Sequence, residues 1–394
     1  MAKQGSSESR MVGNTLFYFS IFCSTKTSGN FAMSELPSDA VDAQDFQQTD
    51  FEKITPLVAA EFQIEEALID QGTPTYYLVW PQETKQAFLR LLKRLEEMGL
   101  IAYLRKVDGR IVLTVVPKPF VKPSNPRTNL ILLVATIATT FVTGYIGFPE
   151  TGINPIINGA IFSAAILLVL GIHEMGHKIA ANKKKIDATS PYFIPGPPPL
   201  GTLGAVIMQK SLPPNRDALF DVGANGPMAG FVIALLCSAV GMTLLIPMTM
   251  SADGGLNLIP VSWLLLLPAL SSLNLIPPLT GTNNGWALHP LLWAGWAGMV
   301  VTMLNLLPAA MLDGGHVARS TLAGDKPRLV LTFASVALLL FTGTEFVIMA
   351  FLIVFMALIK HPGPLDDVSS LSRKRKLVTA VLVAVFILSF PIRV

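Results

Sequence analysis

Two histidines and a glutamate stand together in an H-E-M-G-H motif at residues 173–177. The apolar residues 161–172 before the motif carry no charged side chain. Ionisable groups at membrane depth are costly, so they indicate a functional site. Because residues i and i+4 of a helix share one face, His173 and His177 can bind the same metal ion. Glu174 lies one position further round the helix, where its carboxylate can hold a water molecule beside that ion.

A third ligand is available at the end of another apolar run. Residues 305–316 read N-L-L-P-A-A-M-L-D-G-G-H, and Asp313 is their carboxylate. Two imidazoles and one carboxylate would leave one coordination position open, as catalytic zinc requires. A chance histidine pair at a solvated helix end is the alternative for the first motif alone. The second motif disfavours that alternative, and His316 is expected beside the site, since a fourth ligand would close it.

The composition is that of a membrane protein. The chain has 394 residues, of which 51% are hydrophobic and 14% are charged, whereas about 25% of an average soluble domain is charged. This length allows one small soluble domain and several membrane spans. The net charge of +3 does not indicate nucleic-acid binding, because the basic residues cluster beside apolar runs, where membrane topology explains them. The two cysteines, Cys23 and Cys237, imply no disulfide framework.

The chain divides into a polar front part and an apolar back part. Residues 1–51 are predicted to be a disordered or low-complexity extension, in which Met33 is an alternative start and a transit peptide is a weaker interpretation. Residues 52–118 are predicted to form a soluble α+β domain, and residues 119–128 a proline-rich linker. Residues 129–394 are predicted to be the membrane domain.

The soluble domain has clear local signals. Its helices are expected at 54–69 and 85–98, and its strands at 75–80, 101–107 and 110–116. The last two strands flank Asp108-Gly109, a strong hairpin signal. The domain contains no histidine or cysteine, so we expect it to bind or regulate rather than to catalyse.

The fold class is therefore mainly α, a polytopic helix bundle of about seven spans with a small α+β domain in front. The expected spans cover residues 129–148, 155–181, 218–247, 287–308, a pair within 329–359 broken near residue 343, and 377–390. Residues 261–276 are interrupted by Pro268 and are expected to be re-entrant or interfacial.

Lysine and arginine positions orient these spans. Basic residues lie at 178–185, at 319–328 and at 373–376, whereas residues 248–286 contain none. The positive-inside rule then places the soluble domain and the basic loops in the cytosol. Residues 373–376 are interpreted first as a topology anchor and second as a contact for anionic lipids.

Depth in the membrane supports a shared site. His177 and Asp313 each lie six residues before a basic residue, Lys183 or Arg319, a distance of about 9 Å along a helix. Both ligands are therefore expected at a similar shallow depth on the same side, where water reaches them.

The paired motifs resemble those of the site-2 protease family of intramembrane zinc metalloproteases, in the branch known from plastids and photosynthetic bacteria. The resemblance covers about residues 55–360. It is carried by H-E-M-G-H at 173–177, N-x-x-P-x-x-x-x-D-G at 305–314, P-Y-F-I-P at 191–195 with G-T-L-G-A-V at 201–206, and N-R at 215–216 leading to G-P-M-A-G at 226–230. One departure is Asn225, where a small apolar residue is expected.

The resemblance implies one zinc ion per chain, with His173, His177 and Asp313 as ligands and Glu174 as the general base. Residues 129–394 would then be a transmembrane metalloprotease domain that cleaves transmembrane helices of single-span membrane proteins. The protein would be a multi-pass integral protein in contact with membrane lipids and without a nucleic-acid partner. Its expected location is the plasma membrane, with the N-terminal domain cytosolic; a plastid membrane is the alternative.

Two further roles have alternatives. Asn305 is either a donor to the developing oxyanion or an interhelical hydrogen-bonding residue. The glycine-rich stretch after residue 200 is either an ordinary loop or an edge strand that holds an unwound substrate segment. In the second case the substrate-binding residues are Gly201, Thr202, Gly204 and Val206.

Two other functions fit part of the pattern. A membrane metal transporter or metal sensor would use the same His/Asp cluster for transient binding, but it needs neither Glu174 nor an edge strand. A membrane zinc protease that clips soluble or lipidated tails commonly takes its third ligand from a glutamate.

The geometry expected from these motifs is strict. The Asp313 carboxylate must lie within coordination reach of both His173 and His177, and a separation of more than about 8 Å would contradict a shared metal ion.

Overall fold

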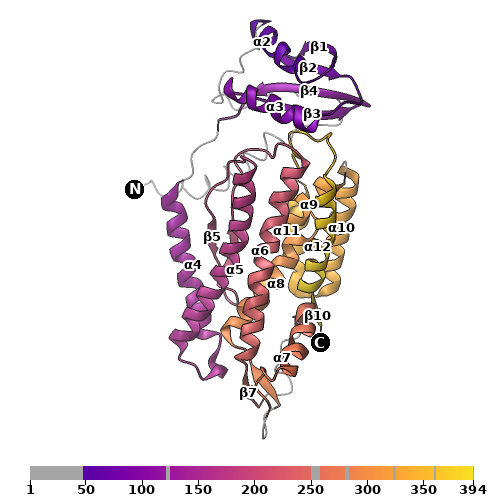
Figure 1. The fold of residues 1–394 in the computed structure, drawn as a ribbon. Helices are drawn as coiled ribbons and strands as arrows, with labels where there is room; N and C mark the ends of the chain where they lie inside the picture. Colours follow the sequence, from indigo (N-terminus) through magenta and orange to yellow (C-terminus); the bar gives the residue numbers. More distant parts are fainter. Residues whose placement is uncertain are drawn as a thin grey trace. The chain divides into compact units, whose positions relative to one another are not determined.

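The computed structural model describes residues 48–120, 125–249, 258–279, 284–322, 325–358 and 361–393. Most of the predicted N-terminal extension and the middle of the predicted linker lie outside these ranges. The chain groups into two compact units (Figure 1). The first contains the residues up to Phe120 together with Pro214–Arg216 and Phe351–Ser370, and the second contains the remainder.

A four-stranded antiparallel sheet forms the centre of the first unit (Figure 1). Its strands, in the spatial order β1-β2-β4-β3, are β1 (Ile64–Asp70), β2 (Thr73–Leu78), β4 (Arg110–Pro117) and β3 (Leu100–Val107). Two helices accompany the sheet, α2 (Gln48–Ala59) and α3 (Lys85–Glu97). Helix α3 buries Phe88, Leu91 and Leu95, whose spacing defines one helical face.

Tight turns close both hairpins of this sheet. The predicted β3–β4 turn is confirmed at Asp108-Gly109, with φ of 48° and 87°. The β1–β2 turn uses Gln71-Gly72 in the same left-handed region, with φ of 46° and 77°. The prediction of a helix over 54–69 is wrong in its second half, because Ile64–Asp70 form the strand β1. Ile64 and Leu68 have helical spacing, but antiparallel pairing with β2 decides the conformation.

The loop after α11 (Val347–Ala357) lies along the outer edge of β3. The Leu104 N–H donates to the Leu365 carbonyl over 2.9 Å, and the Asp367 N–H donates to the Leu104 carbonyl over 3.1 Å. On the other side of this loop, the Asp366 N–H donates to the Pro214 carbonyl over 3.0 Å. We call residues 361–370 the strap. Its central residues cover part of an edge that would otherwise be a site of unwanted pairing.

Side chains reinforce the strap. The fully buried Asp366 carboxylate accepts hydrogen bonds from the backbone N–H groups of Val368 and Ser369 and contacts the Ser369 hydroxyl. The Arg105 guanidinium donates to the Leu365 carbonyl over 2.7 Å. Arg216 forms a 3.1 Å ion pair with Asp367. The sequence analysis did not predict this arrangement, because the partners lie far apart along the chain.

The second unit is a bundle of apolar helices (Figure 1). Three helices in the described part of the chain are long and apolar enough to cross a membrane: α4 (Pro126–Ile146), α5 (Pro155–Lys183) and α6 (Arg216–Thr243). The remaining helices of this unit are shorter: α7 (Val261–Ser272), α8 (Pro290–Leu306), α9 (Asp313–Thr321), α10 (Asp325–Thr342) and α12 (Arg373–Ser389). This architecture is that of a mainly helical integral membrane protein.

Two predicted interruptions of the bundle are present. Helix α10 ends at Thr342, a short 3-10 turn covers Thr344–Phe346, and α11 follows, so the predicted break near residue 343 is confirmed. Helix α7 has 12 residues, which give about 18 Å of length. A hydrocarbon core is about 30 Å thick, so α7 alone is too short to cross it, in line with the re-entrant or interfacial prediction.

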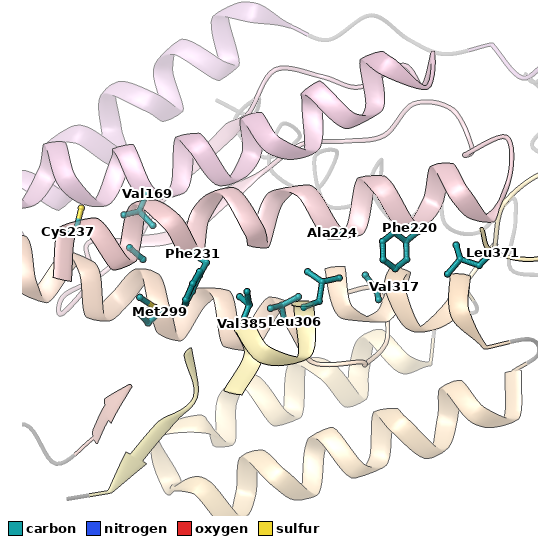
Figure 2. Close-up of a cluster of buried hydrophobic side chains, with 12 residues drawn as sticks. Val169, Phe220, Ala224, Phe231, Cys237, Met299, Leu306, Val317, Leu371 and Val385 are labelled. Atoms are coloured by element: carbon teal, nitrogen blue, oxygen red, sulfur yellow. The ribbon is translucent and has the colours of Figure 1, made fainter. Parts of the chain in front are cut away.

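Helix α6 lies at the centre of the bundle core (Figure 2). Phe220 and Phe231 of this helix are buried together with Val169 of α5, Met299 of α8 and Val385 of α12. A helix that contributes to contacts on several sides cannot shift without disturbing its neighbours. The position of α6 therefore matters for any site that α5 and α9 build beside it.

Small antiparallel sheets complete the second unit. They pair β5 (Tyr192–Pro195) with β6 (Thr202–Val206), β7 (Ile246–Met248) with β9 (Gly285–Ala287), and β8 (Leu258–Pro260) with β10 (Pro391–Arg393).

The strap provides a test of the first unit. Replacement of Asp366 by Ala removes the buried acceptor of the Val368 and Ser369 N–H groups and should destabilise the strap by about 2 kcal/mol, the usual contribution of hydrogen bonds to a charged group. Hydrogen exchange followed by mass spectrometry should then show faster exchange in peptides containing Leu104 and Asp366. The exposed Asp70 provides the control variant Asp70→Ala, and equal exchange in both variants would contradict the pairing.

Candidate metal centre

Helix α5 carries both histidines of the H-E-M-G-H motif on one buried face. His173 is 3% exposed and His177 is 6% exposed. Their Nε2 atoms are 3.1 Å apart. Two buried imidazoles whose Nε2 atoms converge could supply two of the four ligands of a tetrahedral metal site.

Asp313 completes a triangle of ligand atoms. Its Oδ2 atom lies 3.2 Å from the Nε2 atom of His173 and 3.2 Å from that of His177. A tetrahedral zinc ion with bonds of about 2.0–2.1 Å holds its ligand atoms about 3.3 Å apart. The three atoms therefore match the spacing around a single ion, and the separation is well inside the limit set by the sequence analysis.

The break between α8 and α9 brings Asp313 to this point. Helix α8 ends at Leu306, Leu307 leaves the helical conformation with φ −55° and ψ 129°, and α9 begins at Asp313 itself. Pro308 stands in the break, where its missing N–H costs no helical hydrogen bond. A carboxylate in the first turn of a helix is also stabilised by the helix dipole.

Two glycines of α6 make room for the imidazoles. A Cβ atom on Gly226 would overlap the His177 ring, and one on Gly230 would lie 2.9 Å from the His173 Nδ1 atom. Helix α6 therefore packs directly on both rings, and any larger side chain at Gly226 would displace His177. The G-P-M-A-G segment therefore lies against the site, although its two glycines have no side chains that could act as ligands.

The α6 backbone also orients His177. Its Nδ1 atom lies 2.7 Å from the Val222 carbonyl oxygen. A carbonyl oxygen only accepts, so Nδ1 carries a proton, and in the neutral imidazole Nε2 then has its lone pair toward the triangle. Hydrogen bonds of this type set the tautomer and basicity of metal-binding histidines. Sequence analysis missed Val222 because a backbone acceptor leaves no signature in residue type.

Glu174 is buried beside the ligands, with 6% of its surface exposed. A carboxylate oxygen of Glu174 and the nitrogens of His173 and His177 lie within 4.8 Å of one another, so this carboxylate is a second candidate for the third ligand. Asp313 is favoured, because its Oδ2 atom lies at coordination spacing from both nitrogens. Glu174 also accepts a hydrogen bond from the Ile207 backbone N–H. It is therefore placed to handle a water molecule at the ion.

Asn305 of α8 reaches the same triangle. Its Nδ2 atom lies 3.2 Å from the His173 Nε2 atom. Both roles considered for Asn305 fit this position: it makes an interhelical hydrogen bond, and its amide stands beside the ligand atoms, within reach of a carbonyl bound there.

The β5–β6 hairpin runs beside α4 and α5 and carries the predicted substrate-binding residues. Gly201 has φ 71°, and its carbonyl accepts a 2.6 Å hydrogen bond from Thr139 of α4. Thr202 is buried, and its hydroxyl donates to the Ile194 carbonyl inside the hairpin. The Thr202 side chain is thus used internally. Gly204 is half-buried, whereas Val206 is exposed at the end of the strand.

The outer edge of β6 has no strand partner among the described residues, because this sheet contains only β5 and β6. Leu203, which the sequence analysis did not single out, is 70% exposed on the same strand. Ile207 follows β6 directly and contacts Glu174 through its N–H. The hairpin therefore connects an open strand edge to the buried carboxylate.

Fold and site together define a class: a polytopic membrane protein in which two buried histidines converge with a half-buried aspartate, beside a buried glutamate. Residues 161–349 match the model of peptidase family M50. This match confirms the resemblance to the site-2 proteases that the motifs indicated.

Curated plant proteins are similar to part of the chain. The chain is 35% identical over 184 residues to the probable zinc metalloprotease EGY2, chloroplastic, of Arabidopsis thaliana, which covers 46% of this chain and 31% of that protein. It is 33% identical over 174 residues to the probable zinc metalloprotease EGY1, chloroplastic, of the same plant, covering 42% of this chain and 30% of that protein. The chain thus spans about a third of the length of these relatives. No solved structure matches the chain.

The glycine packing gives a prediction. Replacement of Gly226 by Ala should displace the His177 ring and lower zinc affinity at least about tenfold, as loss of supporting contacts around a metal site does. Gly171→Ala is the matched control on α5, because the added methyl would meet only the Phe193 ring at 3.7 Å. Competition with a chromogenic chelator measures zinc affinity in both variants, and equal affinities would contradict the close packing of α6 on His177.

Proposed function

We propose that this chain is an intramembrane zinc endopeptidase that cleaves transmembrane helices of single-span membrane proteins. The observation that carries the proposal is the triangle of His173, His177 and Asp313, with Glu174 buried beside it. The names of the plant relatives, which are probable zinc metalloproteases, support the choice of metal and reaction.

The donor set fits one zinc ion per chain. His173, His177 and Asp313 would hold it, and the Asp313 carboxylate would reduce the net charge of the site, which matters where the dielectric constant is low. When bound, the ion would supply Lewis-acid polarisation of the scissile carbonyl and of the attacking water. One position would stay open for water and substrate, as in catalytic rather than structural zinc sites.

The protein side chains then divide the remaining work. Glu174 takes the proton of the attacking water and delivers it to the leaving amine. The Asn305 amide, which lies 3.2 Å from the His173 Nε2 atom, donates to the carbonyl oxygen as negative charge develops there. Glu174 is buried and Asn305 is half-buried, so their interactions are stronger than they would be at a fully exposed surface.

The open edge of β6 is the proposed substrate-binding element. A transmembrane helix hides its peptide bonds, so a segment must unwind before it is cut. The unwound segment would pair with β6 through main-chain hydrogen bonds, along Gly201, Thr202, Gly204 and Val206. Because Ile207 at the end of β6 contacts Glu174, a paired segment would run toward the base. Unpaired backbone groups are costly within a membrane, and such pairing would satisfy them.

The proposed topology has about seven spans, with the N-terminal soluble domain on the cytosolic side, as the distribution of lysine and arginine indicates. The protein would lie in the plasma membrane or, like its chloroplastic relatives, in a plastid membrane. A metal transporter or sensor with the same cluster is not favoured, since that function requires neither Glu174 nor a strand edge leading to it.

Replacement of Glu174 by Gln tests the reaction. The amide cannot accept the water proton, so cleavage of a co-expressed, tagged single-span protein should fall at least about a hundredfold, while the zinc content measured by mass spectrometry stays at one per chain. Met175→Leu is the control, because Met175 is the exposed neighbour of Glu174. A Glu174→Gln protein that still cuts would show that the base is another group. Metal transport into liposomes without any cleavage would favour the transporter.

Replacement of Asn305 by Leu separates its two roles. If the amide stabilises the oxyanion, cleavage should fall about a hundredfold or more with zinc content unchanged. If Asn305 only links α8 to His173, the loss should appear in thermal stability and zinc retention, with the turnover number of the loaded protein preserved. Cleavage rate, zinc content and melting temperature measured on the same preparation distinguish these outcomes.

A further inference from the structure

A cluster of four charged side chains joins three helices of the second unit. The Arg375 guanidinium of α12 donates to both carboxylate oxygens of Asp221 on α6, over 2.6 Å from Nε and 2.5 Å from Nη2. Its Nη1 atom lies 2.9 Å from a carboxylate oxygen of Asp217, one turn earlier on α6. Lys184, at the C-terminal end of α5, lies 3.0 Å from Asp221. We call these four residues the clasp.

The clasp is more than a surface ion pair. The side chains of Arg375 and Asp221 are 22% and 20% exposed, and that of Asp217 is 13% exposed. A two-bond contact between guanidinium and carboxylate has a fixed geometry. The Ser372 N–H at the start of α12 also donates to Asp217 over 2.9 Å. Partly buried, multiply bonded networks of this kind hold positions that single exposed pairs do not.

The sequence analysis interpreted residues 373–376 as one basic cluster that anchors topology. The structure divides the cluster: Arg373 and Lys374 are exposed, whereas Arg375 is partly buried and bonds to α6. Arg375 also lies outside residues 161–349, the segment that matches the protease family. If Arg375 supports the metal site, this support comes from a residue outside the segment that matches the family.

A short path leads from the clasp to the metal ligands. Val222 follows Asp221 in the chain, and the Val222 carbonyl accepts the hydrogen bond from His177. Gly226, which packs on the His177 ring, lies one turn further along α6. On α5, Lys184 stands seven residues after His177, which is about two helical turns. Asp221 is thus bonded to α5 and to α12 next to the backbone group that orients His177.

We propose that Arg375 is a positioning residue for the metal site. Its bonds to Asp217 and Asp221 hold α6 against α5, so that the Val222 carbonyl and Gly226 keep His177 in its metal-binding orientation. Without Arg375, Asp221 keeps only Lys184 as an ion-pair partner among the described residues, and α6 can shift away from the His177 ring. The inference rests on the proposed zinc protease function, but it concerns residues that take no part in the chemistry.

The test compares two arginines of the same helix. Arg375→Gln removes the clasp, whereas Arg373→Gln removes the same charge from an exposed position for which the structure shows no ion pair to a described residue. Zinc loss from the purified full-length protein to a chromogenic chelator should be about tenfold faster in Arg375→Gln, the lower end of the effect of groups that support metal ligands. Zinc loss from Arg373→Gln should stay close to the wild-type rate.

Three further variants exclude a purely structural effect. Asp221→Asn should speed zinc loss as Arg375→Gln does, and the effect of the double variant should be smaller than the two single effects combined, because the variants share the Arg375–Asp221 interaction. Arg375→Lys keeps the charge without the two-bond geometry and should give an intermediate rate. For cleavage of the tagged substrate, kcat should fall while KM stays near the wild-type value, since the substrate edge is not altered.

The outcomes separate the two proposals. A wild-type protein that binds no zinc would overturn the proposed function and this inference with it. A wild-type protein that holds zinc, together with Arg375→Gln and Asp221→Asn proteins that release it at the wild-type rate, would overturn the clasp alone. Lower melting temperatures with unchanged zinc loss would have the same meaning. If Arg375→Gln does not fold, Arg375→Lys and Asp221→Asn decide by the same measurement.

Discussion

The convergence of three ligand atoms at spacings of 3.1 to 3.2 Å is the constraint on which the rest of the structure depends. Two of the atoms belong to α5 and the third to the first residue of α9. The two helices lie far apart along the chain, so non-covalent packing has to bring them together. Bringing a carboxylate and two imidazoles together away from water is costly unless they are paired or bind a cation. Packing of the surrounding helices has to compensate for this unfavourable free energy.

Helix α6 provides much of this support. It contributes no ligand, yet its glycines allow contact with both imidazoles and its Val222 carbonyl accepts the hydrogen bond from His177. The same helix carries Phe220 and Phe231 in the bundle core and Asp217 and Asp221 in the clasp (Figure 2). One helix thus combines apolar packing, a backbone acceptor and an ion-pair network on the side where it packs against His173 and His177.

Local patterns predicted a large part of this protein. The i, i+4 histidines, the D-G turn of the β3–β4 hairpin and the break near residue 343 depend on neighbours within a few residues, and each is present as expected. The prediction of a helix over 54–69 was wrong in its second half, because a distant partner decides the conformation there. Ile64 and Leu68 have helical spacing, but they pair with β2 in a sheet. The hydroxyl of Thr202 bonds within the hairpin, so any pairing of this residue with a substrate would use its main chain, as the sequence analysis expected.

By itself, the sequence determined which groups could do chemistry and that the two histidines and Glu174 share one apolar helix, because residue type and helical period are local properties. Only the tertiary structure decided that Asp313 rather than Glu174 shares coordination spacing with both histidines, that Val222 orients His177, and that Arg375 differs from its basic neighbours. These outcomes depend on distances between residues that lie far apart along the chain. Packing of helices sets such distances, and no spacing along the chain encodes them directly.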